Sequence, residues 1–217
     1  ILGAHPELAA VIAYYRAVRV DRSAGRVHNS LDRPSLAAHP GWTGADLLGR
    51  RGAVAAGGPS PLQQELAALD PAVAIVMFGT NDVDQTGLDA FSQDLDAVVT
   101  TILDAGIIPV LSTIPDRRDT PQAAARSGPF NAAIRELAAR EHVPLIDYGR
   151  AMQDLPHHGL AADQVHPSNY PSPCPACASV TFTPPGLRYG WNQRNFLTLE
   201  MLAHLKAVVI DDGPPDP

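Results

Sequence analysis

AVAIVMFGTND, residues 72–82, is the stretch that decides the fold class of this chain. Its first seven residues are all apolar, and they lie between Asp70-Pro71 and Gly79. A short apolar run between Pro and Gly is typical of a strand that a sheet buries on both faces. We therefore expect a parallel strand here, with the polar loop Gly79-Thr80-Asn81-Asp82 at its carboxyl end.

Helical and strand patterns alternate along the rest of the chain. Apolar residues recur at helical spacing from Leu88 to Leu103, and Gly106 marks the end of that helix. Apolar runs at 107–114 and 143–146 predict two further strands. Helices are also predicted at 6–18, 45–48, 62–69, 130–138 and 197–208. Because parallel strands need crossover connections, this order predicts an α/β fold with helices on both faces of a parallel sheet.

The start of the chain departs from this pattern. A sheet of this kind ordinarily opens with a central buried strand, whereas this chain opens with a helix and begins Ile1-Leu2-Gly3 without Met. We expect either a weak strand at 26–31 or the loss of an N-terminal strand. The domain is expected to span 1–210, followed by a disordered tail at 211–217.

Composition excludes several classes of function. There are 16 Lys and Arg against 23 Asp and Glu, a formal net charge of −7, whereas a nucleic-acid binder needs a basic footprint. With 45% hydrophobic and 18% charged residues, the chain can bury a core. No run of 18 apolar residues occurs, so no transmembrane segment is expected.

Two loops offer donors for an oxyanion. Asn81 follows the first predicted strand, where ligands bind in open parallel sheets, and its amide is a neutral hydrogen-bond donor. Gly41, in the loop HPGWTG at 39–44, permits close approach of its backbone N–H. The alternatives are a turn whose Asn81 and Asp82 cap the next helix, and a plain turn at Gly41.

A third loop offers a base. In DQVHP at 163–167, Asp163 stands three residues before His166, a spacing that lets the carboxylate hold the ring Nδ1–H. The ring Nε2 then faces the crevice as a general base. The alternative is a solvated loop histidine.

In this order and spacing, the segments GWT (41–43), GTND (79–82) and DQVHP (163–167) resemble blocks II, III and V of the SGNH hydrolases, the GDSL-type esterases and lipases. The resemblance implies a three-layer α/β/α sandwich with a flavodoxin-like parallel sheet. It also implies no metal and no organic cofactor. The implied substrate is a small-molecule ester or an acylated carbohydrate.

The resemblance also implies roles for four residues. Asn81 and the Gly41 amide would be oxyanion-hole donors, His166 would be the base that activates a serine, and Asp163 would orient His166.

The nucleophile is not assigned, because the family's Gly-Asp-Ser motif does not occur in this chain. One alignment puts His5 in the place of the serine, which would make a catalytically inactive binding module. The other places the motif before Ile1, and we favour it because one truncation explains both the missing strand and the missing serine. Ser30 and Ser35 are poor substitutes because they lie too near Gly41 to leave room for the intervening helix.

A second group of residues lies near the C-terminus: His157, His158, His166, Cys174 and Cys177. A zinc site would lack ligands at the usual spacing, and the CPAC sequence does not follow a strand and open a helix as redox pairs do. We expect a local disulfide between the two cysteines. Such a bond indicates an oxidising compartment, as for a secreted or periplasmic protein.

The crevice loops carry aromatic and basic residues with two possible roles: Trp42, Tyr170, Tyr189, Trp191, Arg188 and Arg194. The aromatic residues either shape a substrate pocket or pack beneath loops, and the arginines either bind substrate or pair with acidic neighbours. The long loop at 169–185 is a candidate lid.

Overall fold

The structure is a computed structural model that describes residues 5–21, 27–52 and 57–211. It comprises two compact units, which we call the sheet unit (Asp32–Arg150) and the terminal unit (Ile1–Leu31 with Ala151–Pro217). Residues 1–4, residue 26 of the expected strand at 26–31 and residues 212–217 of the expected tail lie outside the described residues. Among the described helices, none has the length and apolar character needed to cross a membrane.

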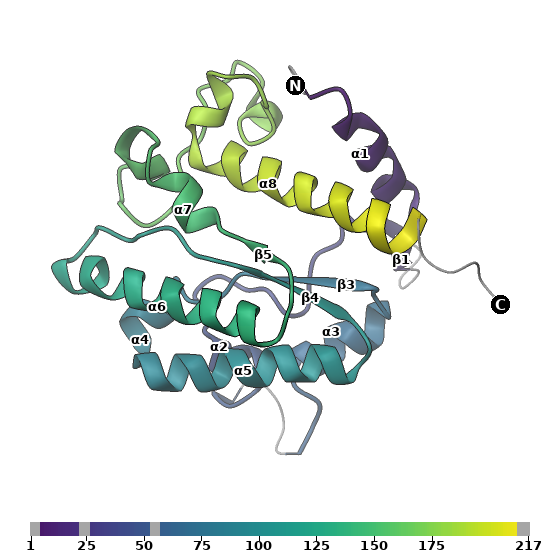
Figure 1. Ribbon diagram of the computed structural model, residues 1–217, viewed down its shortest axis with the longest axis vertical. Helices are drawn as coiled ribbons and strands as arrows, with labels where there is room; N and C mark the ends of the chain where they lie inside the picture. The colour runs from purple at the N-terminus through teal and green to yellow at the C-terminus, as the bar shows by residue number, and fades with distance from the viewer. Residues whose placement is uncertain (1–4, 22–26, 53–56, 212–217) are drawn as a thin grey trace. The chain divides into compact units, whose positions relative to one another are not determined.

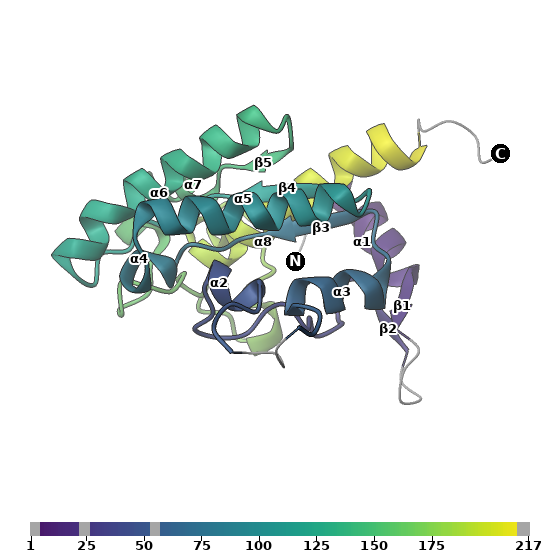
Figure 2. The ribbon, with the colours of Figure 1, turned by 90° about the horizontal axis from the view of Figure 1, so that it is seen from below.

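The sheet unit contains a parallel sheet in the order β3-β4-β5. These strands are Val73–Val76, Ile108–Ser112 and Leu145–Ile146, with Val73 opposite Ile108 and Leu111 opposite Leu145. Helix α5 (Leu88–Asp104) connects β3 to β4, and helix α6 (Pro121–Arg140) connects β4 to β5 (Figures 1 and 2). The shorter helices of this unit are α2 (Gly44–Leu47), α3 (Pro61–Leu69) and α4 (Asp82–Gln85). The predicted α/β class and parallel sheet are confirmed.

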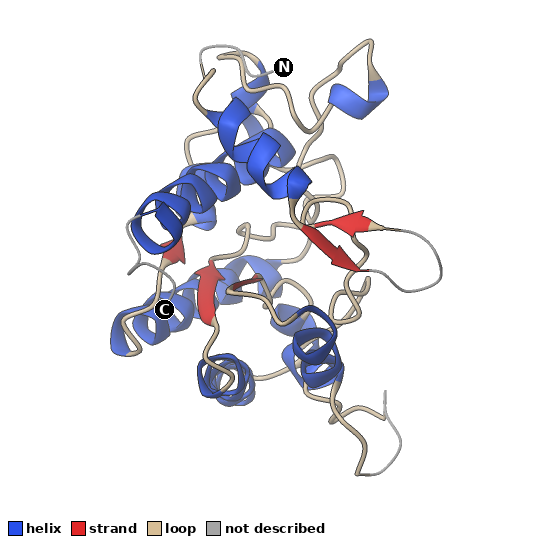
Figure 3. Cartoon of the chain, turned by 90° about the vertical axis from the view of Figure 1, so that its right-hand side faces the viewer, coloured by secondary structure: helices blue, strands red, loops and turns tan. Residues whose placement is uncertain are grey.

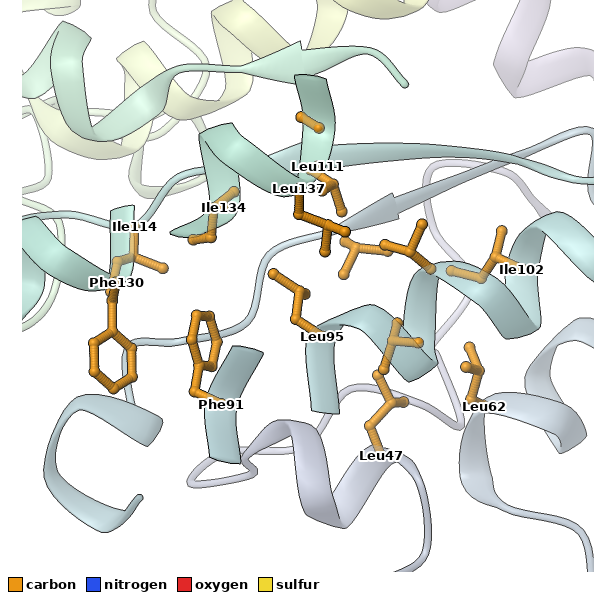
Figure 4. Close-up of a cluster of buried hydrophobic side chains, with 14 of the residues drawn as sticks. Leu47, Leu62, Phe91, Leu95, Ile102, Leu111, Ile114, Phe130, Ile134 and Leu137 are labelled. Atoms are coloured by element: carbon orange, nitrogen blue, oxygen red, sulfur yellow. The ribbon is translucent and has the colours of Figure 1, made fainter. Parts of the chain in front are cut away.

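The core of the sheet unit lies between α5, α6 and the strands. Phe91 and Phe130 stack with ring centroids 4.6 Å apart, and Leu95, Ile134 and Leu137 continue the buried surface (Figure 4). All five come from helix faces with apolar residues three or four positions apart, the spacing that buries one side of a helix. This core fixes the strands and therefore the loops that leave their carboxyl ends.

Two expectations for the sheet unit need correction. Ile75 is 42% exposed, so β3 is not buried on both faces, and within the described residues β3 is an edge strand. Helix α6 begins at Pro121 rather than near 130. Thr120 caps it by accepting a hydrogen bond from the Ala123 N–H at 3.0 Å, a signal that the weakly apolar segment 121–129 did not reveal.

The terminal unit is built on α1 (Leu8–Ala17) and α8 (Gly190–Leu205), which pack against each other. Leu8, Phe182 and Phe196 form its small buried core. Its remaining elements are β1 (Arg19–Asp21), β2 (His28–Asn29), η2 (Pro156–Gly159), η3 (Pro175–Cys177), η4 (Gly186–Arg188) and η5 (Lys206–Asp211). Helix α7 (Tyr148–Met152) crosses the boundary between the units in sequence.

The weak strand expected at 26–31 corresponds to β2, but it does not join the parallel sheet. It pairs antiparallel with β1, the short ribbon of red arrows in Figure 3. Only two residues long and made of His and Asn, β2 lacks the apolar side chains that a central strand would bury.

The loop at 169–185 is tied to α8. The Asn192 side chain accepts from the Thr181 N–H at 2.9 Å, and the Asn195 side chain donates to the Ser179 carbonyl at 2.8 Å. Phe182 is buried. The second half of this loop is therefore part of the terminal unit's core, and only its first half remains a candidate for a lid.

Candidate active site

The loop after β3 presents Asn81 to the Gly41 loop of the sheet unit. Gly79 makes the turn possible, because its φ of +126° is unfavourable for L side chains and a Cβ would lie 3.3 Å from Phe91 Cζ. The Asn81 Nδ2 donates a hydrogen bond of 2.8 Å to the carbonyl of Trp42. One amide hydrogen thus orients the side chain, and the second remains for a ligand.

Gly41 occupies a turn with φ of +82°. Its carbonyl accepts a hydrogen bond from Gln85 Nε2 at 3.3 Å, whereas no described residue accepts a hydrogen bond from its N–H. The structure therefore brings the two predicted oxyanion donors onto adjoining loops. Each retains an N–H that is not used within the described part of the chain.

A buried carboxyl group joins the same two loops. Asp82 is fully buried, and its Oδ1 accepts a hydrogen bond of 3.1 Å from the N–H of Gly44. Its Oδ2 is buried without a hydrogen-bond partner among the described residues. Burial raises the pKa of Asp82, and the nearby Asp94 carboxylate raises it further.

Arg117 is a residue that the sequence did not single out. It lies after the carboxyl end of β4, almost fully buried, and its Nη1 donates to the carbonyl of Thr80 at 3.0 Å. Asp119 receives two further hydrogen bonds from the guanidinium, at 2.9 and 2.6 Å, and Asp84 lies 2.5 Å from Nη2. Arg117 therefore holds the residue next to Asn81. Its position after a parallel strand was the available signal.

The terminal unit holds the second predicted pair on one tight turn. The His166 Nδ1 lies 2.7 Å from Asp163 Oδ2, while Asp163 Oδ1 accepts from the N–H groups of Val165 and His166, both at 3.0 Å. An isolated bridge between Leu160 and Pro167 closes the turn. Asp163 therefore contacts the imidazole through one hydrogen bond, and the two backbone hydrogen bonds to its other oxygen hold the carboxylate in place.

This geometry determines the electrostatics of the pair. The backbone N–H groups of Val165 and His166, together with the His166 side chain, lower the pKa of Asp163 to about 2. A carboxylate at Nδ1 fixes the tautomer that leaves the Nε2 lone pair free. The His166 side chain is 70% exposed, and its Nε2 has no hydrogen-bond partner in the described residues.

The four predicted site residues thus form two pairs, each within its own unit. Asn81 and the Gly41 loop suit the stabilisation of negative charge, and Asp163 with His166 suits proton transfer. Their action on one substrate stays a prediction.

The second predicted cluster is organised by a disulfide. Cys174 and Cys177 are bonded to each other at η3, with their Cα atoms 5.2 Å apart. His157 and His158 both have positive φ angles, 52° and 53°. Among the described residues, no group of three or more His, Cys, Asp or Glu side chains is arranged to hold a metal ion.

Comparison with known families shows which family this chain matches. A family model, the GDSL-like lipase/acylhydrolase family, matches residues 15–170, more than half of the chain. The chain belongs to the GDSL-like lipase/acylhydrolase family. A search of curated proteins found no significant match.

Solved structures show that this GDSL-like family member shares the fold of known hydrolases. A GDSL-like lipase from Bacteroides thetaiotaomicron is 19% identical with a TM-score of 0.53, covering 77% of this chain and 73% of its own. A lipase/acylhydrolase from Enterococcus faecalis is 20% identical with a TM-score of 0.55, covering 76% and 72%. A catalytic mutant of an acetylxylan esterase from Geobacillus stearothermophilus is 18% identical with a TM-score of 0.52, covering 88% and 79%.

The residues considered as nucleophile or its replacement have other contacts in this GDSL-like chain. His5 packs its ring 4.4 Å from that of Phe196 and lies 3.3 Å from a Glu7 oxygen. The Ser35 hydroxyl accepts a hydrogen bond from the Ala37 N–H at 3.0 Å.

Proposed function

We propose that this protein is a carboxylic-ester hydrolase that works through a serine acyl-enzyme. The supporting observation is the turn at 163–166, where an ionised carboxylate lies 2.7 Å from one imidazole nitrogen of His166 and leaves the other nitrogen free. That arrangement is the one a general base needs.

The proposed reaction has two halves. The serine oxygen attacks the ester carbonyl while His166 Nε2 takes its proton, and the carbonyl oxygen becomes an oxyanion. The C–O bond to the alcohol then breaks, and His166 returns the proton to the leaving alcohol. Water then attacks the acyl carbonyl while His166 takes its proton, the bond between the acyl carbon and the serine oxygen breaks, and His166 returns the proton to that oxygen as the acid leaves.

Asn81 and Gly41 are proposed to bind the oxyanion. The hydrogen bond from Asn81 to the Trp42 carbonyl fixes one donor, and Gly41 offers a backbone N–H from the adjoining loop. Donors held in place before the reaction stabilise the developing charge without reorganising. Arg117 is proposed as a positioning residue for Asn81, through Thr80.

A second candidate is an inactive binding module, which is favoured by the absence of Gly-Asp-Ser from the 217 residues. Treatment of the gene-encoded protein with a fluorophosphonate distinguishes the hydrolase from the binding module, because this reagent labels an activated serine. One labelled serine in a Gly-Asp-Ser segment, with loss of labelling in His166→Ala, supports the hydrolase. No labelled serine and no ester hydrolysis would support the module, and hydrolysis unchanged in His166→Ala would overturn the role of His166.

We infer that the substrate is a small-molecule ester or an acylated carbohydrate, with support from the acetylxylan esterase among proteins of this fold. We also propose an oxidising location, secreted or periplasmic, because a disulfide persists there. Fractionation of the producing cells tests this proposal. Finding the protein only in a reducing cytosol would contradict it.

A further inference from the structure

A pocket of about 360 Å³ lies entirely within the terminal unit. It is lined by Pro156, His157, Leu160, Ser168, Tyr170, Pro185, Arg188 and Tyr189. Its volume is in the range of small-ligand sites, about 300–1,000 Å³.

Two of the pocket's lining residues, Leu160 and Ser168, flank the turn that carries His166. Leu160 is bridged to Pro167, and the Ser168 N–H donates to the Gly159 carbonyl at 2.8 Å, so the pocket begins where that turn ends. The Ser168 hydroxyl also donates to the Gly159 carbonyl, at 3.0 Å, and accepts from the Gly190 N–H at 3.1 Å. Ser168 therefore joins the turn to the start of α8, immediately after Tyr189.

The pocket walls combine aromatic rings with positive charge. Tyr170 and Tyr189 meet edge to face, with ring centroids 5.4 Å apart at 78°. Arg188 and His157 are exposed, and neither side chain forms a hydrogen bond or ion pair with a described residue. No lining residue carries a carboxylate, so the guanidinium has no anionic partner within the pocket.

The backbone conformation of His157 also supports a ligand site. His157 holds φ at +52°, in the left-handed region that costs a non-glycine residue free energy. Such residues cluster at ligand-binding positions, where the surrounding structure over-determines the backbone. Here the strained backbone places the His157 imidazole at the pocket, where no described residue forms a hydrogen bond with it.

This chemistry discriminates among ligands. A fatty acyl chain would desolvate Arg188, His157 and two phenol groups without giving them hydrogen bonds. A neutral sugar would place its apolar face on the tyrosines but leave the guanidinium without an anion. A sugar ring that bears a carboxylate satisfies the rings and the guanidinium together.

We propose that this pocket binds a sugar carrying a carboxylate group, so that the ester substrate is an acylated carbohydrate containing a uronic acid. The substrate part of this inference rests on the proposed function. The binding part concerns the terminal unit alone and is measured without catalysis.

The experiment compares methyl glucuronide with methyl glucoside by calorimetry and ligand-detected NMR on the 217-residue chain. We expect the glucuronide to bind about ten- to a hundredfold more tightly, the range for hydrogen bonds to a charged group. Arg188→Gln should abolish that preference. Arg16→Gln, an exposed arginine of α1 outside the pocket, is the matched control and should retain it.

Two tyrosine variants separate packing from hydrogen bonding. Tyr189→Ala should weaken both sugars, whereas Tyr189→Phe keeps the ring and should retain most of the glucoside affinity. Equal affinity for the two sugars, no detectable binding of either, or tighter binding of octanoate than of the glucuronide would each overturn the pocket assignment. Sugar binding without ester hydrolysis by the native protein would overturn the proposed function but not the pocket assignment. Ester hydrolysis without sugar binding would overturn the pocket assignment but not the proposed function.

Discussion

Replacing Asn81 with alanine is the perturbation with the most specific expected result. The side chain has two amide hydrogens, of which one is held by the Trp42 carbonyl at 2.8 Å and one is proposed to reach the oxyanion. Asn81→Ala removes both. The two losses affect different quantities, turnover and stability, and can be measured separately.

Loss of one oxyanion donor lowers kcat by about 10²–10³, equivalent to about 2.7–4 kcal/mol of transition-state stabilisation. KM should change little, because the oxyanion forms only in the transition state. Loss of the neutral hydrogen bond to Trp42 costs about 0.5–1.5 kcal/mol of stability. For a protein of this size, Tm should fall by about 1–6 °C.

The assay is ester hydrolysis by the protein as its gene encodes it, with thermal unfolding measured on the same preparation. Gln85→Ala is the matched control, since it removes two exposed hydrogen bonds, one donated to the Gly41 carbonyl at 3.3 Å and one accepted from Arg51 at 2.7 Å, and should leave kcat nearly unchanged. A kcat within threefold of the unmodified protein for Asn81→Ala would refute the oxyanion role. A similar loss in both variants would show that movement of the Gly41 loop, rather than the lost donor, causes the effect.

Three further predictions concern charge and packing. Asp163→Asn should lower kcat strongly, because it releases the imidazole of His166. The folded pKa of Asp163 is about 2, below its ordinary value, so the stability that Asp163 contributes is present above about pH 4 and disappears as pH falls through about 2. The unfolding temperatures of the variant and the parent should therefore converge near pH 2. Asp82→Asn should gain stability relative to the parent as pH rises from 4 to 7, because burial raises the pKa of Asp82 and its charged form is unfavourable. A stability difference between this variant and the parent that stays constant over the same pH range would contradict the reasoning. Phe91→Ala should lower the unfolding free energy by about 3–5 kcal/mol in urea titration, against well under 1.5 kcal/mol for the partly exposed Leu88→Ala on the same helix.

The elements with strong apolar periodicity were readable from the sequence. The pattern at 88–103 gave α5 to within one residue, and the run at 107–114 contained β4. The first half of α6 was missed because residues 121–129 offer few apolar side chains, so a cap at Thr120 rather than periodicity starts that helix. Burial of β3 was overestimated because the sequence does not report which strand lies at a sheet edge.

The candidate site divides in the same way. The contact of Asp163 with His166 follows from a spacing of three residues, which the sequence displays directly. Two hydrogen bonds join segments that are far apart in the sequence: Asn81 to Trp42, 39 residues apart, and Arg117 to Thr80, 37 residues apart. Those contacts depend on how β3 and β4 are packed, so spacing alone could not indicate them.

The central proposal is that the four predicted groups act on one ester, with Asn81 and Gly41 binding its carbonyl oxygen and His166, oriented by Asp163, taking the proton of the attacking serine. A crystal structure of the native protein after reaction with a phosphonate ester tests it most directly, because the adduct marks the reacting atom. We predict a phosphonyl oxygen about 2.7–3.1 Å from both Asn81 Nδ2 and the Gly41 nitrogen, with His166 Nε2 beside the modified serine oxygen. An adduct that lies away from His166, or one whose phosphonyl oxygen contacts neither Asn81 nor Gly41, would contradict it.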